Sequence, residues 1–302
     1  MDLIEADEYL HPPTKEIKWR ESYYFNWVDL KNKISGFSTV GIVPNENRRE
    51  MVFFLFLEDK KEIYYKQPLL ESYEENIELM LQDKRLSYSL IKPFKLWHIS
   101  YNSRKLKFDI SFKTRFPTYY FGLDSSASWQ QHFEASGIIE GNLKLHGEVN
   151  IKVKGFGQRD KSWGYRDWHQ FDKWYAGHFQ FKEWSCAFRK DHIEDRVDLS
   201  GHISNNKGNL PLKSLDINTT NENDKFESPL ISIYKIEDIN GNIHQIKAER
   251  ISKDSFIRFT RSYSQGYTEL FEQMVIMTNM NTGEIGSGMM EHLRTKRIKR
   301  VL

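Results

Sequence analysis

Apolar and polar residues alternate with a period of two along several stretches of the chain. In residues 106–112 the apolar positions begin at Leu106 and recur at every second residue, with polar residues between them. The same alternation runs through residues 139–153, interrupted by a turn at Gly147. Strict alternation is typical of strands with one buried and one wet face. We therefore predict antiparallel strands, including a long hairpin that ends at Gly155.

Other stretches carry weaker strand signals. Residues 21–29 hold four aromatic residues in five positions, and two apolar runs at 36–43 and 51–57 flank a turn-prone segment at 44–47. Further candidate strands recur at spacings of about 8–12 residues, separated by Asn- and Gly-containing turns, as in a sandwich or antiparallel barrel. Only residues 68–85 have apolar positions at helical spacing, and they are the one predicted helix, with an irregular strand as the alternative for the same residues.

Composition sets the class of protein. The chain has 302 residues, a length that favours two domains, and 14% of them are aromatic, which favours strands. A net charge of +2 gives no general electrostatic basis for binding nucleic acid. No run of eighteen apolar residues occurs, so we predict no membrane-spanning helix. With a single cysteine, Cys186, and an acidic N-terminus without an apolar leader, the sequence predicts a cytoplasmic protein.

The most unusual stretch runs from residue 155 to 168 and reads GFGQRDKSWGYRDW. It combines two Arg-Asp pairs with two tryptophans, a tyrosine and three glycines. Arginine and aspartate are rarely buried unless they are paired, and tryptophan is mostly buried. The stretch is therefore either the wall of an apolar cavity lined by charged pairs, or a structural brace between Arg159 and Asp160.

This motif resembles the signature of bacterial proteins related to carotenoid 1,2-hydratase and to AttH. Three further segments resemble the same family, namely the aromatic strand at 21–26, His132-x-Glu134-x-x-Gly137, and Gly286-x-Gly288-x-x-Glu291. The hydratase motif typically has a histidine where this chain has Lys161. The resemblance extends from about residue 20 to residue 291.

The resemblance implies an all-β fold of two lipocalin-like antiparallel barrel or sandwich domains in tandem. We place them at residues 1–154 and 155–302. It also implies an elongated apolar cavity and a hydrophobic small-molecule partner, since family members hydrate isoprenoid double bonds or guide polyene cycloadditions. The expected ligand is an isoprenoid, terpenoid or polyene.

Acid–base chemistry on such a ligand needs carboxyl or imidazole groups in apolar surroundings, and a developing cation needs aromatic faces. Arg159 is adjacent to Asp160, which favours an ionised, structurally paired Asp160. The candidate catalytic residues are Glu291, Glu134, His132 and Asp160. The candidate ligand-binding residues are Arg159, Trp163, Tyr165, Trp168, Tyr24 and Trp27.

Other chemistries find little support. The histidines and carboxylates near residue 169 lack metal-ligand spacing, and no nucleophile elbow or complete dinucleotide fingerprint occurs. We expect no metal and no cofactor. Three hypotheses remain: a cofactor-independent cyclase, isomerase or hydratase, a non-catalytic carrier of a lipid-like ligand, and an interaction protein whose cavity is filled by side chains.

Overall fold

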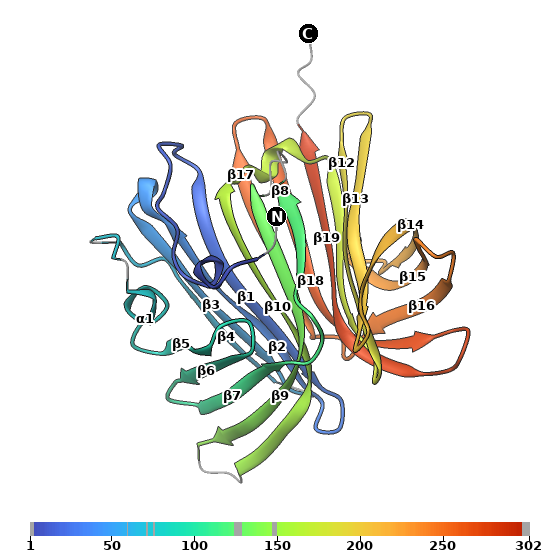
Figure 1. The fold of residues 1–302 in the computed structure, drawn as a ribbon, viewed down its shortest axis with the longest axis horizontal. Helices are drawn as coiled ribbons and strands as arrows, with labels where there is room; N and C mark the ends of the chain where they lie inside the picture. The colour runs from blue at the N-terminus through green and yellow to red at the C-terminus, as the bar shows by residue number, and fades with distance from the viewer. Residues whose placement is uncertain are drawn as a thin grey trace. The chain divides into compact units, whose positions relative to one another are not determined.

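The computed structural model describes residues 3–58, 60–70, 72–74, 76–123, 129–146 and 150–297. The chain forms two compact units, Met1–Arg166 and Asp167–Leu302 (Figure 1). Both units consist almost entirely of antiparallel strands, as predicted.

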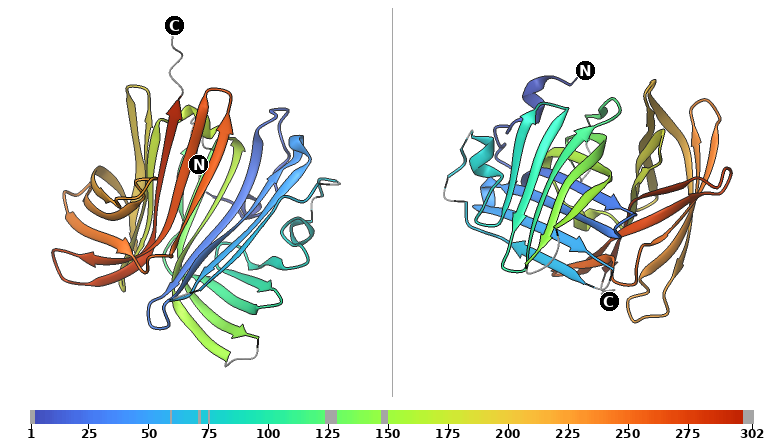
Figure 2. Two further views of the ribbon diagram at one scale, coloured as in Figure 1. Left: turned by 180° about the vertical axis from the view of Figure 1, so that it is seen from behind. Right: turned by 90° about the horizontal axis from the view of Figure 1, so that it is seen from below.

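The first unit is built on a ten-stranded sheet in the order β4-β3-β2-β1-β10-β9-β7-β6-β5, with β8 paired to β9. The sheet curves into an open half-barrel (Figure 2). Its strands are β1 (Trp19–Asp29), β2 (Ile34–Val43), β3 (Arg48–Phe56), β4 (Lys61–Lys66), β5 (Leu86–Lys92), β6 (Leu96–Asn102), β7 (Leu106–Thr114), β8 (Tyr119–Leu123), β9 (Gln131–Leu145) and β10 (Asn150–Tyr165).

The two predicted hairpins are present. The short 3-10 helix η2 (Pro44–Glu46) joins β2 to β3, and β9 pairs with β10 over the predicted alternating stretch. The predicted turn at Gly147 lies outside the described residues. Helix α1 occupies only Ile77–Met80, a small part of the 68–85 segment in which a helix is predicted.

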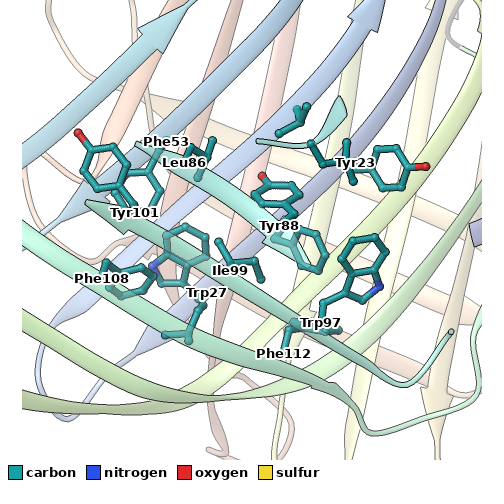
Figure 3. Packing of buried hydrophobic residues seen from close by; sticks show 14 of the residues in the cluster. Tyr23, Trp27, Phe53, Leu86, Tyr88, Trp97, Ile99, Tyr101, Phe108 and Phe112 are labelled. Carbon is teal, nitrogen blue, oxygen red and sulfur yellow. The ribbon is translucent and has the colours of Figure 1, made fainter. Parts of the chain in front are cut away.

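The core of the first unit lies on the inner face of its curved sheet. Its aromatic residues pack against one another (Figure 3). The ring of Trp27, for example, lies 5.6 Å from Phe53 and 5.0 Å from Phe108 between ring centroids. Alternation in β7 follows the prediction, since Leu106 and the apolar residues after it are buried.

The second unit is built on a nine-stranded sheet in the order β16-β15-β14-β13-β12-β11-β19-β18-β17. A further pairing of β16 with β18 closes eight of these strands into a barrel. The strands are β11 (Lys173–Gln180), β12 (Trp184–Ile193), β13 (Arg196–Asn205), β14 (Gly208–Asn221), β15 (Pro229–Asp238), β16 (Ile243–Arg250), β17 (Phe256–Tyr263), β18 (Gly266–Asn279) and β19 (Ile285–Arg297). The closed barrel and the half-barrel are two lipocalin-like domains in tandem.

The division between the units falls after Arg166, whereas the sequence places it between residues 154 and 155. The difference arises because residues 155–165 continue β10, which pairs with β1 on one side and β9 on the other. Glycines permit this close pairing. A side chain at Gly157 would place its Cβ 2.2 Å from the carbonyl oxygen of Asn26.

Two more short 3-10 helices complete the described elements, η1 (Glu5–Glu8) in the first unit and η3 (Trp168–Gln170) in the second. Within the described residues, no helix has the length and apolar character that crossing a membrane requires.

Candidate functional site

Strand β10 carries the central motif, and its successive side chains point to opposite faces of the first sheet. Arg159 lies on the inner face, opposite Phe25 of β1, which belongs to the core. Asp160 lies on the outer face, opposite Tyr24 of β1 and Glu134 of β9. The predicted Arg159–Asp160 brace is therefore wrong, because adjacent strand residues cannot meet on one face.

On the inner face, Arg159 is paired with a residue from the N-terminal segment. Its guanidinium donates two hydrogen bonds to the carboxylate of Glu8, at 2.6 and 2.9 Å, and both side chains are fully buried. Glu8 also accepts a hydrogen bond from the backbone amide of Phe94. A bidentate arginine–carboxylate pair of this kind is geometrically specific. The guanidinium that we considered for ligand binding thus fastens η1 to the half-barrel.

A second buried ion pair lies beside it. The ammonium of Lys161 is 2.8 Å from Glu21, and it also donates to the carbonyls of Asp7 and Tyr9. Burial lowers the pKa of Lys161. Burial alone would raise the pKa of Glu21, but the charge of Lys161 and a hydrogen bond from His11 lower it overall. Lys161, which stands where the hydratases have histidine, therefore holds the N-terminal segment in place.

Three of the aromatic residues proposed for ligand binding lie on the same inner face as Arg159, namely Trp27, Trp163 and Tyr165. Trp27 is a fully buried core residue. Trp163 packs with Trp19 and Phe133, and the ring of His11 stacks on it at 3.9 Å. Tyr165 is the last residue of β10 and is half-buried.

On the outer face, His132 and Glu134 form a buried pair. They are two residues apart in β9 and so share a face, and His132 Nε2 lies 2.8 Å from Glu134 Oε1. The amide of Gln158 donates to Glu134 Oε2 at 2.9 Å. Each side chain of the pair is about 5% exposed. Both carboxylate oxygens of Glu134 are thus held, and one of them orients the imidazole.

The other nitrogen of the imidazole is available. His132 Nδ1 has no hydrogen-bond partner in the described part of the chain. Trp129 stacks on the imidazole with 4.3 Å between ring centroids, and Phe121 approaches to 4.8 Å. Since an ionised carboxylate only accepts hydrogen bonds, the neutral imidazole carries its proton on Nε2 and its lone pair on Nδ1. This is the arrangement of a general base positioned by a carboxylate.

Asp160 and Tyr24 extend this polar strip across the outer face. The register puts Asp160 directly opposite both Glu134 and Tyr24, and Asp160 is half-buried. Tyr24 stacks with Phe37 on the same face. Four of the predicted site residues, His132, Glu134, Asp160 and Tyr24, therefore lie together on three adjacent strands. We call this set the outer-face cluster.

The remaining two predicted residues belong to the second unit. Glu291 of β19 accepts a hydrogen bond from the indole of Trp174 at 2.5 Å, and the register places it opposite Glu272 of β18. Trp168 of η3 packs edge-to-face against Trp174, and the guanidinium of Arg261 lies over its ring at 4.1 Å. Within the second unit, these residues form a group carried by η3, β11, β17, β18 and β19.

Among the described residues, no group of three His, Cys, Asp or Glu side chains is placed to hold a metal ion.

Sequence reasoning did not identify the N-terminal segment at residues 7–11, although it supplies the partners of Arg159 and Lys161. Nothing in its own pattern marks it, because Glu8 and the carbonyls of Asp7 and Tyr9 bind Arg159 and Lys161, about 150 positions later.

A family model and several solved structures match this chain. A family model described as "Domain of unknown function (DUF7064)" matches residues 5–296. The chain belongs to this family. The matched residues extend over both units. Comparison with curated proteins gave no significant match.

Several solved structures resemble this DUF7064 chain over nearly its full length. CghA, solved with Sch210972, has a TM-score of 0.67 at 8% identity, covering 93% of this chain and 89% of CghA. A putative AttH from Nitrosomonas europaea has a TM-score of 0.67 at 11% identity, with coverages of 95% and 94%. Kievitone hydratase from Nectria haematococca has a TM-score of 0.59 at 12% identity, with coverages of 91% and 88%. At these identities the comparisons establish the fold, and the expected resemblance to AttH and the hydratases is confirmed at that level.

Proposed function

We propose that this protein is a cofactor-independent enzyme that binds an elongated hydrophobic small molecule and promotes its hydration, isomerisation or cyclisation. The expected ligand is an isoprenoid, terpenoid or polyene. The observation that carries the proposal is the buried pair of His132 and Glu134, with Nδ1 of the imidazole unpartnered. The shared fold with a hydratase and with CghA, which was solved with a bound small molecule, supports it.

His132 is the proposed proton carrier. Its Nδ1 takes a proton from a carbon acid or from water, and Glu134 then stabilises the imidazolium that forms. Aromatic faces at Trp129 and Phe121 supply further cation stabilisation. A positioned base of this kind contributes roughly 10²- to 10⁴-fold to a rate.

The acid strength of imidazolium limits which double bonds the pair can act on. An imidazolium is too weak an acid to protonate an isolated double bond, but it exchanges protons readily at carbon next to a carbonyl group. The pair therefore favours hydration or isomerisation of a double bond conjugated to a carbonyl. Asp160, opposite Glu134 in register, is the proposed second proton carrier, and Tyr24 a proposed ligand contact.

Glu291 remains a proposed catalytic residue of lower rank. One of its oxygens already accepts the indole hydrogen of Trp174, a contact that a purely structural carboxylate would also make. A non-catalytic carrier of a lipid-like ligand is the alternative function, and it requires no base at His132.

The test begins with native mass spectrometry of gently purified protein to identify a co-purified hydrophobe. Conversion of that compound is then followed by liquid chromatography for wild type, His132→Gln and His98→Gln. His98 is the matched control, since it forms a 2.9 Å pair with Asp109 but is about one-third exposed. We expect His132→Gln to lower turnover at least 100-fold with unchanged affinity, and His98→Gln to leave both unchanged. Binding without conversion by wild type would favour the carrier, and full turnover by His132→Gln would overturn the assignment of the base.

A further inference from the structure

The inner wall of the second-unit barrel contains buried polar groups that have no hydrogen-bond partner among the described residues. Gln273 of β18 is fully buried, and neither its side-chain oxygen nor its nitrogen has a hydrogen-bond partner in the described residues. Nε2 of His292 in β19 is likewise unpartnered in that part of the chain, and this side chain is 7% exposed. Leaving a buried polar group without a hydrogen bond destabilises a fold, so two such groups close together call for an explanation.

Strand alternation places both side chains inside the barrel. Gln273 is two residues from Val275, and His292 is two residues from Met290, and both apolar residues belong to the barrel core. Side chains two residues apart on a strand share a face. In the β18–β19 register Gln273 lies opposite Met290, and Phe271 lies opposite His292. Gln273 and His292 are thus diagonal neighbours on the inner wall.

Tyr175 and Lys190 continue the same row around the wall. Tyr175 of β11 lies opposite His292, with 4.9 Å between ring centroids, and Lys190 of β12 lies opposite Tyr175. Lys190 Nζ donates to the carbonyl of Leu215 in β14 at 2.6 Å, which also places it inside the barrel. We call Gln273, His292, Tyr175 and Lys190 the interior arc.

The interior arc carries one positive charge, on Lys190. Lys190 has only a backbone carbonyl as a partner, and no carboxylate pairs with it among the described residues. Glu269 lies two positions before Phe271 and so shares its face of β18, but its carboxylate already forms ion pairs with Arg258 and Arg294. Burial, reinforced by the charge of Arg294, lowers the pKa of His292 to about 3, so this imidazole is neutral near pH 7. An ammonium, a free amide and a neutral imidazole beside an aromatic ring are suited to one anion with an apolar body.

We propose that the interior arc is a second ligand site, which binds a small hydroxylated carboxylic acid with an aromatic or aliphatic body. The carboxylate accepts hydrogen bonds from Lys190, and the hydroxyl group bonds to the amide of Gln273, which offers both a donor and an acceptor. Eight-stranded barrels are wide enough to hold one small ligand, and ligand sites commonly lie in their mouths. This site lies in the second unit and does not depend on the activity proposed at His132.

The test is a calorimetric titration of the full-length protein with 4-hydroxycinnamate, 10-hydroxydecanoate and 4-hydroxycinnamyl alcohol. We expect wild type to bind at least one of the acids with micromolar affinity and to bind the alcohol at least tenfold more weakly. Gln273→Met should weaken acid binding at least tenfold while raising the melting temperature, because it removes an unsatisfied amide. Lys190→Met should abolish the preference for the acid over the alcohol.

Exposed residues of the same barrel provide the controls. Gln245→Met and Lys235→Met change the same residue types on the outside and should leave binding unchanged. His132→Gln should also leave it unchanged, which separates this site from the outer-face cluster. Flat titrations with all three probes on folded wild type would overturn the proposal, because water alone would then satisfy the polar groups of the interior arc. Undiminished acid binding by Gln273→Met would also overturn it.

Discussion

The guanidinium of Arg159 is bound by the carboxylate of Glu8, which lies 151 residues earlier in the chain. This pair joins the N-terminal segment to the inner face of β10. It leaves Asp160, on the opposite face, beside Glu134 and His132. One dipeptide of the central motif therefore supplies a structural residue to one face and a candidate functional residue to the other.

Removing one partner of this buried pair should destabilise the protein strongly. We expect Glu8→Gln to lower the free energy of unfolding by about 3–5 kcal/mol, because it leaves the Arg159 charge uncompensated. Glu5→Gln, an exposed change in the same 3-10 helix, should have an effect within about 0.5 kcal/mol. Denaturant unfolding measures both.

Asp160→Asn provides the contrast. Because Arg159 is paired elsewhere, this change should cost much less than Glu8→Gln, about 1 kcal/mol. A loss as large as that of Glu8→Gln would contradict the assignment of the two side chains to opposite faces.

The sequence predicted the strands well where alternation is strict, as in β7 and the β9–β10 hairpin. Its resemblance to the hydratase-like family correctly indicated the tandem lipocalin-like fold. The predicted boundary lies between residues 154 and 155, whereas β10 continues to Tyr165. A Cβ at Gly155 would lie 1.9 Å from the carbonyl oxygen of Val28, so β10 can pair this closely with β1 only because Gly155 has no side chain.

The sequence proposed the residues of the outer-face cluster, but not the ion pairs beside it. His132 and Glu134 could be selected by residue type and spacing, since residues two apart on a strand share a face. The partners of Arg159 and Lys161 could not, because they come from residues 7–21 and are brought close only by the fold. Trp27 was proposed for ligand binding on aromatic content, but that content is used largely in mutual packing of the first core.

Stability should depend on pH through His292. Its pKa is lowered from 6.5 to about 3 on folding, so the unfolded chain binds a proton below about pH 6.5 that the folded chain does not. Stability therefore falls as pH falls from 6.5 towards 3, by up to about 1.4 kcal/mol per pH unit from this group. In thermal unfolding between pH 7 and pH 4, His292→Leu should show a shallower decline than wild type. An unchanged slope would contradict a buried, neutral His292.

Glu291→Gln should raise the melting temperature or leave it unchanged. Glu291 lies directly opposite Glu272 in the β18–β19 register, and like charges in that position destabilise a sheet by roughly 0.2–1 kcal/mol. The amide oxygen of glutamine can still accept the hydrogen bond from Trp174. Glu284→Gln is the control, because the Glu284 carboxylate also accepts an indole hydrogen bond, from Trp184, but the residue lies just before β19 and has no register partner in β18. Scanning calorimetry of the two variants compares their melting temperatures with that of wild type. A clear loss of stability only in Glu291→Gln would show that its charge has a structural purpose.

The central claim is that His132 transfers protons to or from carbon in a bound hydrophobic molecule. Incubation of the co-purified hydrophobe with the protein in D₂O, followed by mass spectrometry of the recovered compound, tests it most directly. The account predicts solvent deuterium at carbon with wild type and with His98→Gln, and none above the uncatalysed background with His132→Gln although that variant still binds the compound. Deuterium incorporation at the wild-type rate by His132→Gln, or none with wild-type protein that binds the compound, would contradict it.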